Sequence, residues 1–251
     1  MDQRVKSVSS AQQVNCAHDK RVNCGNCRLN TLCMPVSLHV NDIDKLNQII
    51  QRGRPLQKGE YLFRANDPFS SVFAIRSGSV KAVTLSENGD EQVTGFYLPG
   101  EIVGLDGLAD NVYTNSVIAL ETASVCEIPF HRLEELSLQL PALQRHFLQI
   151  MSREITQDQH IISLLSKSSA DARIASLLLS ISARNSNRGL SSTAFLLPMS
   201  RTELGNFLGL TIETVSRTLS KLQANDILGV NKKDIVIKDI NALKQLAKGA
   251  D

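Results

Sequence analysis

The sequence lacks any hydrophobic run that could cross a membrane. No apolar stretch approaches the roughly 18 residues that a transmembrane helix requires. Residues 1–15 are polar and lack the apolar segment of a secretory signal. The 5 cysteines are an odd number, so they cannot all pair as disulfides. We therefore expect a cytoplasmic protein with free thiols and no membrane partner.

The sequence also lacks the residue patterns of common catalytic sites. It contains no convincing Ser/His/Asp set, paired-carboxylate cleft or glycine-rich phosphate loop between a strand and a helix. The 5 histidines show no ligand spacing among themselves. These absences predict that the chain is not an enzyme.

Charge is unevenly distributed over the 251 residues. Residues 41–166 contain 10 Lys and Arg against 16 Asp and Glu, whereas residues 167–251 contain 12 against 7. A basic C-terminal third favours a polyanionic partner at that end. With 42% apolar residues the chain can bury a substantial core, and its length indicates about two domains.

Three cysteines are closely spaced near the N-terminus, as Cys24, Cys27 and Cys33. A C-x2-C turn brings two sulfurs close enough to bind one ion or one edge of a cluster. Cys33 and a fourth thiol would complete a four-thiolate site, and the spacing leaves zinc and an iron–sulfur cluster both open. Cys126 is the remaining downstream thiol, although a lone cysteine in a strand is more often a small core residue. Cys16 stays unassigned.

Short apolar runs alternate with glycines from residue 54 to residue 130. The runs include Tyr61–Phe63 and Val72–Ile75, and the dipeptide Asn88-Gly89 is a hairpin signal. Turns that recur every few residues predict a compact barrel or jelly roll, not strands that alternate with helices.

A continuous helical pattern follows, over residues 141–166. One of its faces repeats at steps of four and three residues, the spacing of a coiled-coil seam: Met151, Ile155, Asp158 and Ile162. A linker helix with one solvated edge would show the same pattern. We favour the seam because of Asp158. In a homodimer each Asp158 would face its copy across the apolar stripe, where the two carboxylates would repel each other and lose solvation. Such a dimer would be marginal, and a second site would have to stabilise it.

The C-terminal third contains two short helical segments joined by a glycine turn. Ser200 can cap the first segment, Gly209 supplies the turn, and Thr211 caps the second segment, over residues 212–224. Two helices joined in this way form a helix-turn-helix, whose second helix enters the major groove of double-stranded DNA. The following hairpin, Ile227–Ile237, has a basic tip and would form a wing against the phosphate backbone.

Polar side chains on the second helix can read bases. Arg217 suits the two acceptors of guanine, Glu213 suits the amino group of cytosine, and Ser216 can contact a base or a phosphate. The alternative is a solvated ion pair between Glu213 and Arg217, which are four residues apart.

These patterns predict an α+β fold with an N-terminal β jelly-roll sensor barrel, a long dimerisation helix and a C-terminal winged helix-turn-helix. The predicted parts are a cysteine-rich, metal-binding segment with a helix over residues 1–53, the β-barrel domain over 54–140, the dimerisation helix over 141–166, and the DNA-binding domain over 167–251.

Taken together, these features resemble the superfamily of the cyclic AMP receptor and FNR. The resemblance is carried by the cysteine trio, the β pattern, the long helix and the segments Ser200–Leu210 and Glu213–Arg217, and it covers nearly the whole chain from Cys24 onward. Within the superfamily the chain is most similar to the FNR type, the oxygen-responsive regulators of fumarate and nitrate reduction.

The resemblance implies a homodimer that holds a [4Fe-4S] cluster in the absence of oxygen. It further implies that the dimer binds palindromic promoter sites and contacts RNA polymerase to activate or repress genes of anaerobic metabolism. Carried over residue by residue, the family's cluster ligands fall on Cys24, Cys27, Cys33 and Cys126, its base-reading residues on Glu213, Ser216 and Arg217, its dimer-repulsive aspartate on Asp158, and its polymerase contact on Gly89 and Asp90.

Cyclic-nucleotide receptors of the superfamily follow a Gly-Glu pair with an arginine that holds the cyclic phosphate. Here Gly100-Glu101 is present, but the segment Asn111–Val117 contains no arginine. A buried phosphate without a cation would stay uncompensated, which disfavours nucleotide binding. A zinc-stapled or nucleotide-gated regulator remains the alternative, and an iron–sulfur electron carrier is a third hypothesis, for which a helix-turn-helix would be superfluous.

Overall fold

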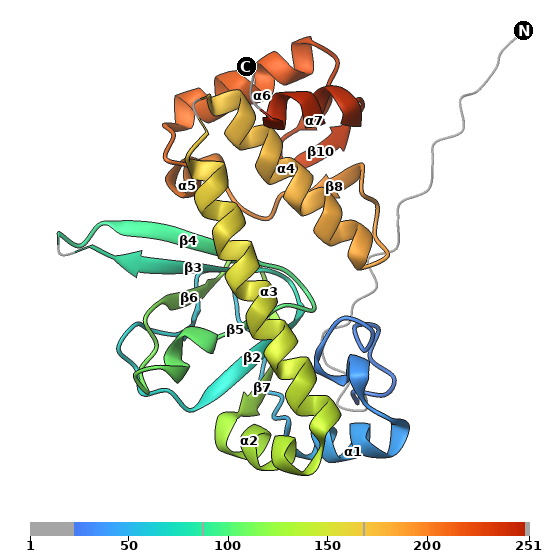
Figure 1. Ribbon diagram of the computed structural model, residues 1–251. Coiled ribbons are helices and arrows are strands. Elements are labelled where there is room, and N and C mark those ends of the chain that lie inside the picture. The colour runs from blue at the N-terminus through green and yellow to red at the C-terminus, as the bar shows by residue number, and fades with distance from the viewer. Residues whose placement is uncertain (1–22, 87, 168, 249–251) are drawn as a thin grey trace, which may run out of the picture.

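The computed structural model of the chain describes residues 23–86, 88–167 and 169–248. Cys16 and the first part of the predicted segment 1–53 lie outside these ranges. Figure 1 shows a long helix, α3, passing along the body of the molecule. Two smaller helices and the cysteine-rich segment lie at one end of α3, strands lie beside its middle, and the C-terminal helices lie at its other end.

The strands beside α3 form two antiparallel sheets with the orders β1-β6-β3-β4 and β5-β2-β7. The predicted fold class is confirmed, although within the described ranges the strands make two facing sheets of a jelly roll and not one closed barrel. Their bounds are β1 Tyr61–Phe63, β2 Ser71–Ser77, β3 Val80–Leu85, β4 Glu91–Tyr97, β5 Ile102–Val103, β6 Ser116–Ala119 and β7 Ser124–Pro129.

Both faces of β2 are buried, which explains why this strand is a continuous apolar run. Phe73 and Ile75 face the interior between the two sheets. Val72 and Ala74 face the opposite way, toward a layer of helices. Cys126 of β7 pairs with Ala74 of β2 and packs against the helix layer. The jelly roll therefore presents Cys126 on the side where the cysteine-rich segment lies.

The helix layer comprises four elements that pack on this sheet. Leu46, Leu133 and Leu143, which come from three different helices, are at most 1% exposed. None of the described helices is long and apolar enough to cross a membrane. The elements are the 3-10 helix η1 Met34–Ser37, α1 Val40–Ile49, α2 Phe130–Gln139 and α3 Pro141–Leu165, while a further 3-10 helix, η2 Leu105–Leu108, follows β5.

The C-terminal part has the predicted helix starts. Ser200 and Glu203 form a capping box at the start of α5, and the Thr211 hydroxyl caps α6. Gly209 ends α5 with φ of 63°, a conformation that favours glycine. The sheet order is β8-β10-β9. The bounds are α4 Ala170–Asn187, β8 Ala194–Leu196, α5 Arg201–Leu208, α6 Ile212–Ala224, β9 Leu228–Asn231, β10 Asp234–Ile237 and α7 Ile240–Lys248.

Candidate metal centre and DNA-reading surface

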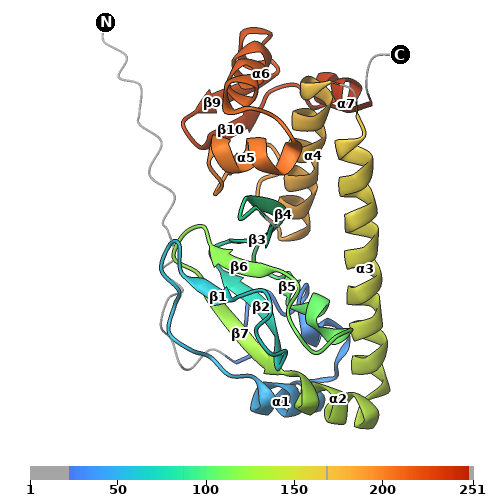
Figure 2. The same cartoon turned by 90° about the vertical axis from the view of Figure 1, so that its left-hand side faces the viewer.

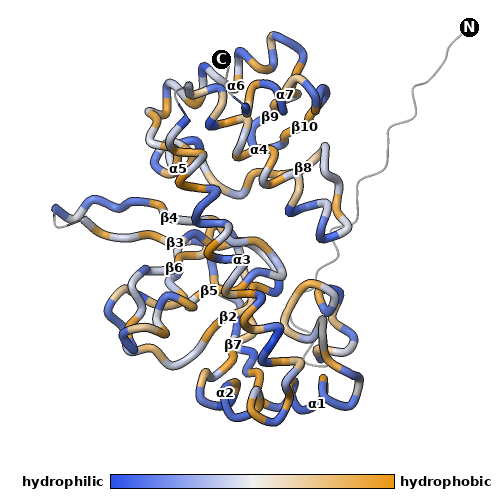
Figure 3. The backbone as a smooth tube through the Cα atoms, viewed as in Figure 1, coloured by the Kyte–Doolittle hydropathy of each residue, from blue (hydrophilic) through white to orange (hydrophobic). Residues whose placement is uncertain are grey.

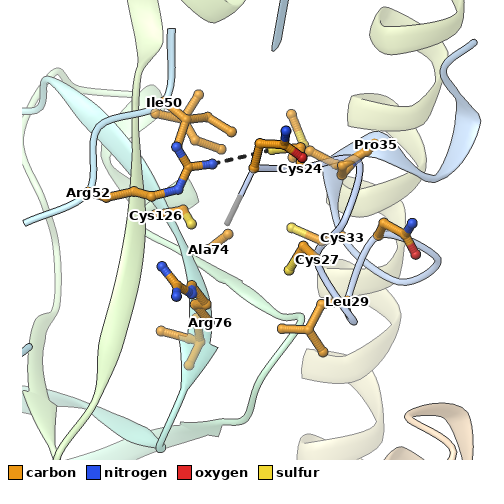
Figure 4. Close-up of a pocket in the computed structure, with 15 residues that line it drawn as sticks. Cys24, Cys27, Leu29, Cys33, Pro35, Ile50, Arg52, Ala74, Arg76 and Cys126 are labelled. Atoms are coloured by element: carbon orange, nitrogen blue, oxygen red, sulfur yellow. Dashed lines mark hydrogen bonds between the residues drawn. The ribbon is translucent and has the colours of Figure 1, made fainter. Parts of the chain in front are cut away.

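Four cysteines line one cavity between the N-terminal segment and the β5-β2-β7 sheet. Cys24, Cys27 and Cys33 come from the turns that precede η1, and Cys126 comes from β7. Figure 4 shows Cys27 and Cys33 on the loop side of this cavity and Cys126 on the strand side. Residues that are far apart in the sequence are thus brought together at one place.

Local hydrogen bonds explain how the loop folds. The Asn23 and Asn26 side chains accept hydrogen bonds from each other's backbone N–H groups, at 2.9 and 3.0 Å. The Cys33 backbone N–H donates to the Leu29 carbonyl at 2.9 Å. The Leu29 side chain is only 6% exposed. Short-range polar turns therefore hold the three loop cysteines in place.

Arg52 brings a positive charge to the side of the thiols. Its guanidinium donates to Cys24 Sγ at 3.7 Å and to Asn47 Oδ1 at 2.7 Å, and Asn47 Oδ1 also accepts from the Cys24 backbone N–H at 3.2 Å. Figure 4 shows the bond between Arg52 and Cys24. The backbone of Gln51 pairs with that of Glu127, next to Cys126, which fixes Arg52 beside the strand. A cation is thus built into the site.

Burial favours the protonated form of three of the thiols, Cys24, Cys33 and Cys126. Burial raises the pKa of Cys24 to about 11 and that of Cys33 to about 12, and it also raises the pKa of Cys126. The positive charge of Arg52 opposes this shift at Cys24 and Cys126. Because metals bind thiolates, a bound metal would have to displace these protons.

The donor set fits a thiolate-bound metal centre, but the free space between the thiols is small. Its volume is about 30 Å³, which is room for only one or two water-sized groups. Among the described residues, no three His, Cys, Asp or Glu side chains are already grouped as metal ligands. The cysteine loop would therefore have to move outward to admit a cluster.

The cysteine loop is attached directly to α3. His146 of α3 is only 1% exposed, and its Nε2 lies 3.2 Å from the carbonyl oxygen of Cys33. A carbonyl oxygen only accepts, so the ring nitrogen is the donor. Met34, the next residue, is 1% exposed and packs in the same core as Leu143 of α3. A polar bond and an apolar contact thus join Cys33 to α3.

The opposite face of α3 carries an exposed apolar stripe. Ile155 is 59% exposed and Ile162 is 68% exposed, while Met151 is half-buried and Asp158 is exposed. Leu148, seven residues before Ile155, is 59% exposed and extends the stripe by one turn. Side chains of this kind are covered when two α3 helices pair.

A larger cavity, of about 510 Å³, lies between the jelly roll and α3. Its ionisable residues include Asp106, Glu154 and Asp158, and no Lys or Arg of the described ranges lines it. Such a wall would repel a phosphate, in agreement with the argument from the sequence. Glu101 does not line this cavity; it forms ion pairs with Arg184 of α4 and with Arg188, the residue that follows α4. The Gly100-Glu101 pair therefore lies outside this cavity, and Asp106 is one of the three carboxylates that line it.

On α6 the three expected base-reading residues lie away from the core. Glu213 and Arg217 are exposed and Ser216 is half-buried, whereas Val215 and Leu219 are at most 3% exposed. Arg217 Nη2 lies 3.4 Å from Thr214 Oγ1. The buried face of α6 packs against the domain, so its polar face is free to enter a groove.

The wing and the sensor hairpin have exposed polar tips. At the wing tip Lys232 is exposed, with φ of 55°, while Lys233 donates to the Pro198 carbonyl. One lysine is therefore left for a phosphate. Gly89 and Asp90 lie at the tip of the β3–β4 hairpin, which Figure 3 shows as hydrophilic. The Asp90 backbone N–H donates to Ser86 Oγ at 3.1 Å, which keeps this turn tight.

Several site residues escaped the sequence-based reasoning. Leu148 could have been found by extending the seven-residue repeat one step toward the N-terminus. Asn47, Arg52 and His146 carry no local signal, because their roles depend on which segments meet in the fold.

The chain is similar to known proteins over nearly its whole length. Residues 53–139 match the family described as cyclic nucleotide-binding domain, and residues 172–246 match the Crp-like helix-turn-helix domain. The chain is 50% identical over 240 residues to the transcriptional activator protein FnrA of Stutzerimonas stutzeri, covering 96% of this chain and 98% of that protein. It is 44% identical over 226 residues to the fumarate and nitrate reduction regulatory protein of Escherichia coli K12, covering 90% of each. The solved structure of FixK2 from Bradyrhizobium japonicum has a TM-score of 0.73 and 27% identity, and the match covers 81% of this chain and 100% of that one.

Proposed function

The chain belongs to the FNR type of transcription regulators in the cyclic AMP receptor and FNR superfamily, and on this premise we propose that it is a cytoplasmic oxygen sensor. In this proposal Cys24, Cys27, Cys33 and Cys126 hold a [4Fe-4S] cluster in the absence of oxygen. The loaded protein dimerises, binds palindromic promoter sites, and contacts RNA polymerase to activate or repress genes of anaerobic metabolism. As a regulator of this family it is not an enzyme.

The observation that supports the proposal most is the convergence of four thiols on one cavity next to α3. A bound [4Fe-4S] cluster would supply an oxygen-sensitive link among four thiolates. The chain's own part is to attach Cys33 to α3 through His146 and Met34. A movement of the cysteine loop would therefore be transmitted to α3, the helix that carries the exposed stripe.

The stripe on α3 supports a homodimer whose stability is marginal. Leu148, Met151, Ile155 and Ile162 offer apolar surface, while Asp158 would face its copy. Partial desolvation raises the pKa of Asp158 in the single chain, although its side chain is exposed, and pairing with a second copy would desolvate it further. A small change at the cysteine site could then decide between monomer and dimer.

The DNA-reading part of the proposal depends on the two-fold symmetry of the dimer. Two α6 helices about 34 Å apart would enter successive major grooves, with Glu213, Ser216 and Arg217 at base edges. A monomer keeps half of these contacts and loses most of the specific affinity. Gly89 and Asp90 are proposed to contact RNA polymerase, since the hairpin projects from the body of the protein.

The cofactor can be tested by purification under nitrogen followed by iron, sulfide and zinc analysis. We expect a brown protein with about four irons and four sulfides per chain, and we expect Cys126→Ala to lose them. Cys16→Ala is the matched control and should keep them. A colourless protein that contains zinc would support the zinc-stapled alternative, and a Cys126→Ala variant that retains the cluster would show that the fourth ligand is wrong.

A further inference from the structure

The sensor domain and the helix-turn-helix are joined at the edge of a sheet. In the order β1-β6-β3-β4 the strand β4 is an edge strand, so the backbone groups on its outer side have no strand partner among the residues that the structure describes. Figure 2 shows α5, the first helix of the helix-turn-helix, directly above β4. The contact at this edge involves α5 of the DNA-binding domain and not another strand.

Asn206 of α5 makes the bonds that a neighbouring strand would make. Its Oδ1 accepts from the Val93 backbone N–H at 2.6 Å, and its Nδ2 donates to the Glu91 carbonyl at 2.7 Å. The Asn206 backbone carbonyl also accepts from Gln92 Nε2 at 2.8 Å. A primary amide is suited to this place, because it offers one acceptor and one donor side by side.

Further contacts surround these bonds. The Lys81 ammonium lies 3.1 Å from the Glu203 carboxylate, and both side chains are at least three-quarters buried. The rings of Phe96 and Phe207 meet at 5.1 Å with an interplanar angle of 60°. These aromatic residues belong to one apolar core that runs from the jelly roll into the DNA-binding domain. The sheet edge is therefore part of a packed interface between the jelly roll and the DNA-binding domain.

We propose that Asn206 is a positioning residue that fixes the helix-turn-helix on the sensor domain by completing the free edge of β4. Since α5 leads into α6 through the single turn at Gly209, anchoring α5 also sets the direction of the reading helix. The docked arrangement leaves Glu213 and Arg217 exposed, so it is compatible with DNA binding. In a dimer, two such anchors would set the distance between the reading helices.

The inference rests on the part of the proposed function in which a dimer binds palindromic DNA, and it does not depend on the cysteine site. Its first test is hydrogen–deuterium exchange of the full chain. The Val93 amide should exchange at least about tenfold faster in Asn206→Ala than in the unmodified chain, because the bond to Oδ1 is lost. Asn241→Ala, at an exposed asparagine of α7, is the matched control and should leave this amide unchanged. Unchanged exchange in Asn206→Ala would overturn the anchor.

The second test measures positioning itself. A palindromic duplex is selected from a random library with the anaerobically prepared unmodified chain, and affinity is then measured for this duplex and for versions with one base pair added or removed between the half-sites. We expect Asn206→Ala to bind the duplex of optimal spacing about tenfold more weakly than the unmodified chain does. On the duplexes of altered spacing the two proteins should have almost the same affinity. An unchanged spacing preference, or an equal loss at every spacing, would contradict the proposal.

A loss of the Asn206 contacts should not separate the two domains, and a second variant covers the case in which Asn206→Ala does not fold. Arg184 of α4 donates to the Phe96 carbonyl at 2.6 Å, so a second contact still holds the two domains together in Asn206→Ala. If that variant does not fold, Gln92→Ala removes one of the bonds from an exposed side chain and should shift the spacing preference in the same direction. If the unmodified chain itself prefers no palindrome, the proposed function fails, while the exchange of Val93 still decides whether Asn206 covers the edge.

Discussion

His146 Nε2 lies 3.2 Å from the carbonyl oxygen of Cys33, across the contact between α3 and the cysteine loop. Removing the donor would leave a part-buried carbonyl without this partner, at a cost of about 1–3 kcal/mol. We expect His146→Leu to lose its visible cluster absorbance faster in air than the unmodified chain does. His146→Gln keeps a donor, so its rate of loss should be closer to that of the unmodified chain. His160→Leu, at an exposed histidine of the same helix, serves as the control. Equal decay in all four proteins would argue against the attachment.

Arg52 should stabilise the metal centre through its charge. Its guanidinium donates to Cys24 Sγ, and its positive charge opposes the rise that burial causes in the pKa of Cys24. In competition with a chelator under nitrogen, we expect Arg52→Gln to bind iron about tenfold more weakly than the unmodified chain does. Arg52→Lys should show a smaller loss of iron affinity. Arg54→Gln is the control, since Arg54 pairs with Glu60 on the surface. Identical iron retention in Arg52→Gln and Arg54→Gln would remove the electrostatic argument.

Asp158→Ala should favour the dimer even in air. The substitution removes two carboxylates that would face each other and adds apolar surface to the stripe. Sedimentation of the air-exposed protein should show a larger dimer fraction than in the unmodified chain. The exposed Asp110→Ala, away from α3, should behave like the unmodified chain. A monomer in both variants would place the dimer contact on another surface.

The Glu154 carboxyl group should make a contribution to the stability of the metal-free chain that decreases as the pH rises from about 4.5 to about 7. Burial raises the pKa of Glu154 to about 7 from 4.5, in spite of the bond that Tyr97 donates to it. The folded state then holds the proton more tightly than the unfolded state, so the penalty is absent below pH 4.5 and complete above pH 7.

Glu154→Gln should therefore be more stable than the unmodified chain at pH 8, by roughly 1–2 kcal/mol, and nearly equal at pH 4. Denaturant unfolding of dilute, metal-free protein at both pH values measures the difference. The exposed Glu135→Gln on α2 is the control. The same stability difference at both pH values would mean that the Glu154 carboxylate is not the titrating group.

Arg217 and Lys232 should affect DNA binding in different ways. Arg217→Ala should cost about 1–3 kcal/mol and relax the preference at one base pair, because a bidentate contact to guanine is lost. Lys232→Ala should weaken binding to all sequences alike and lower the salt dependence by about one charge. Competition titrations at several salt concentrations separate the two effects. A uniform loss for Arg217→Ala would assign it to the backbone instead.

The sequence predicted those features whose signal is local. The caps at Ser200 and Thr211 and the buried face of α6 follow from residue type and periodicity, and the structure has them where they were expected. The long helix was expected over residues 141–166 and spans Pro141–Leu165. In each case neighbouring residues in the chain carry the information.

Features that depend on distant segments could not be predicted in this way. Glu101 was considered only as part of a Gly-Glu pair, but the fold turns it toward Arg184 of α4. Asn206 looked like an ordinary polar residue of a short helix until β4 came to lie beneath it. A single sequence contains no pattern that reports which sheet edge a helix will meet.

The most direct test of the account is one DNA titration performed twice on the same sample. Protein prepared under nitrogen, with its iron and sulfide measured, is titrated against a fluorescent palindromic duplex before and after exposure to air. We predict that air removes the iron–sulfur absorbance and lowers specific affinity by at least about a hundredfold. Equal affinity before and after the loss of iron would contradict the claim that the four cysteines control DNA binding.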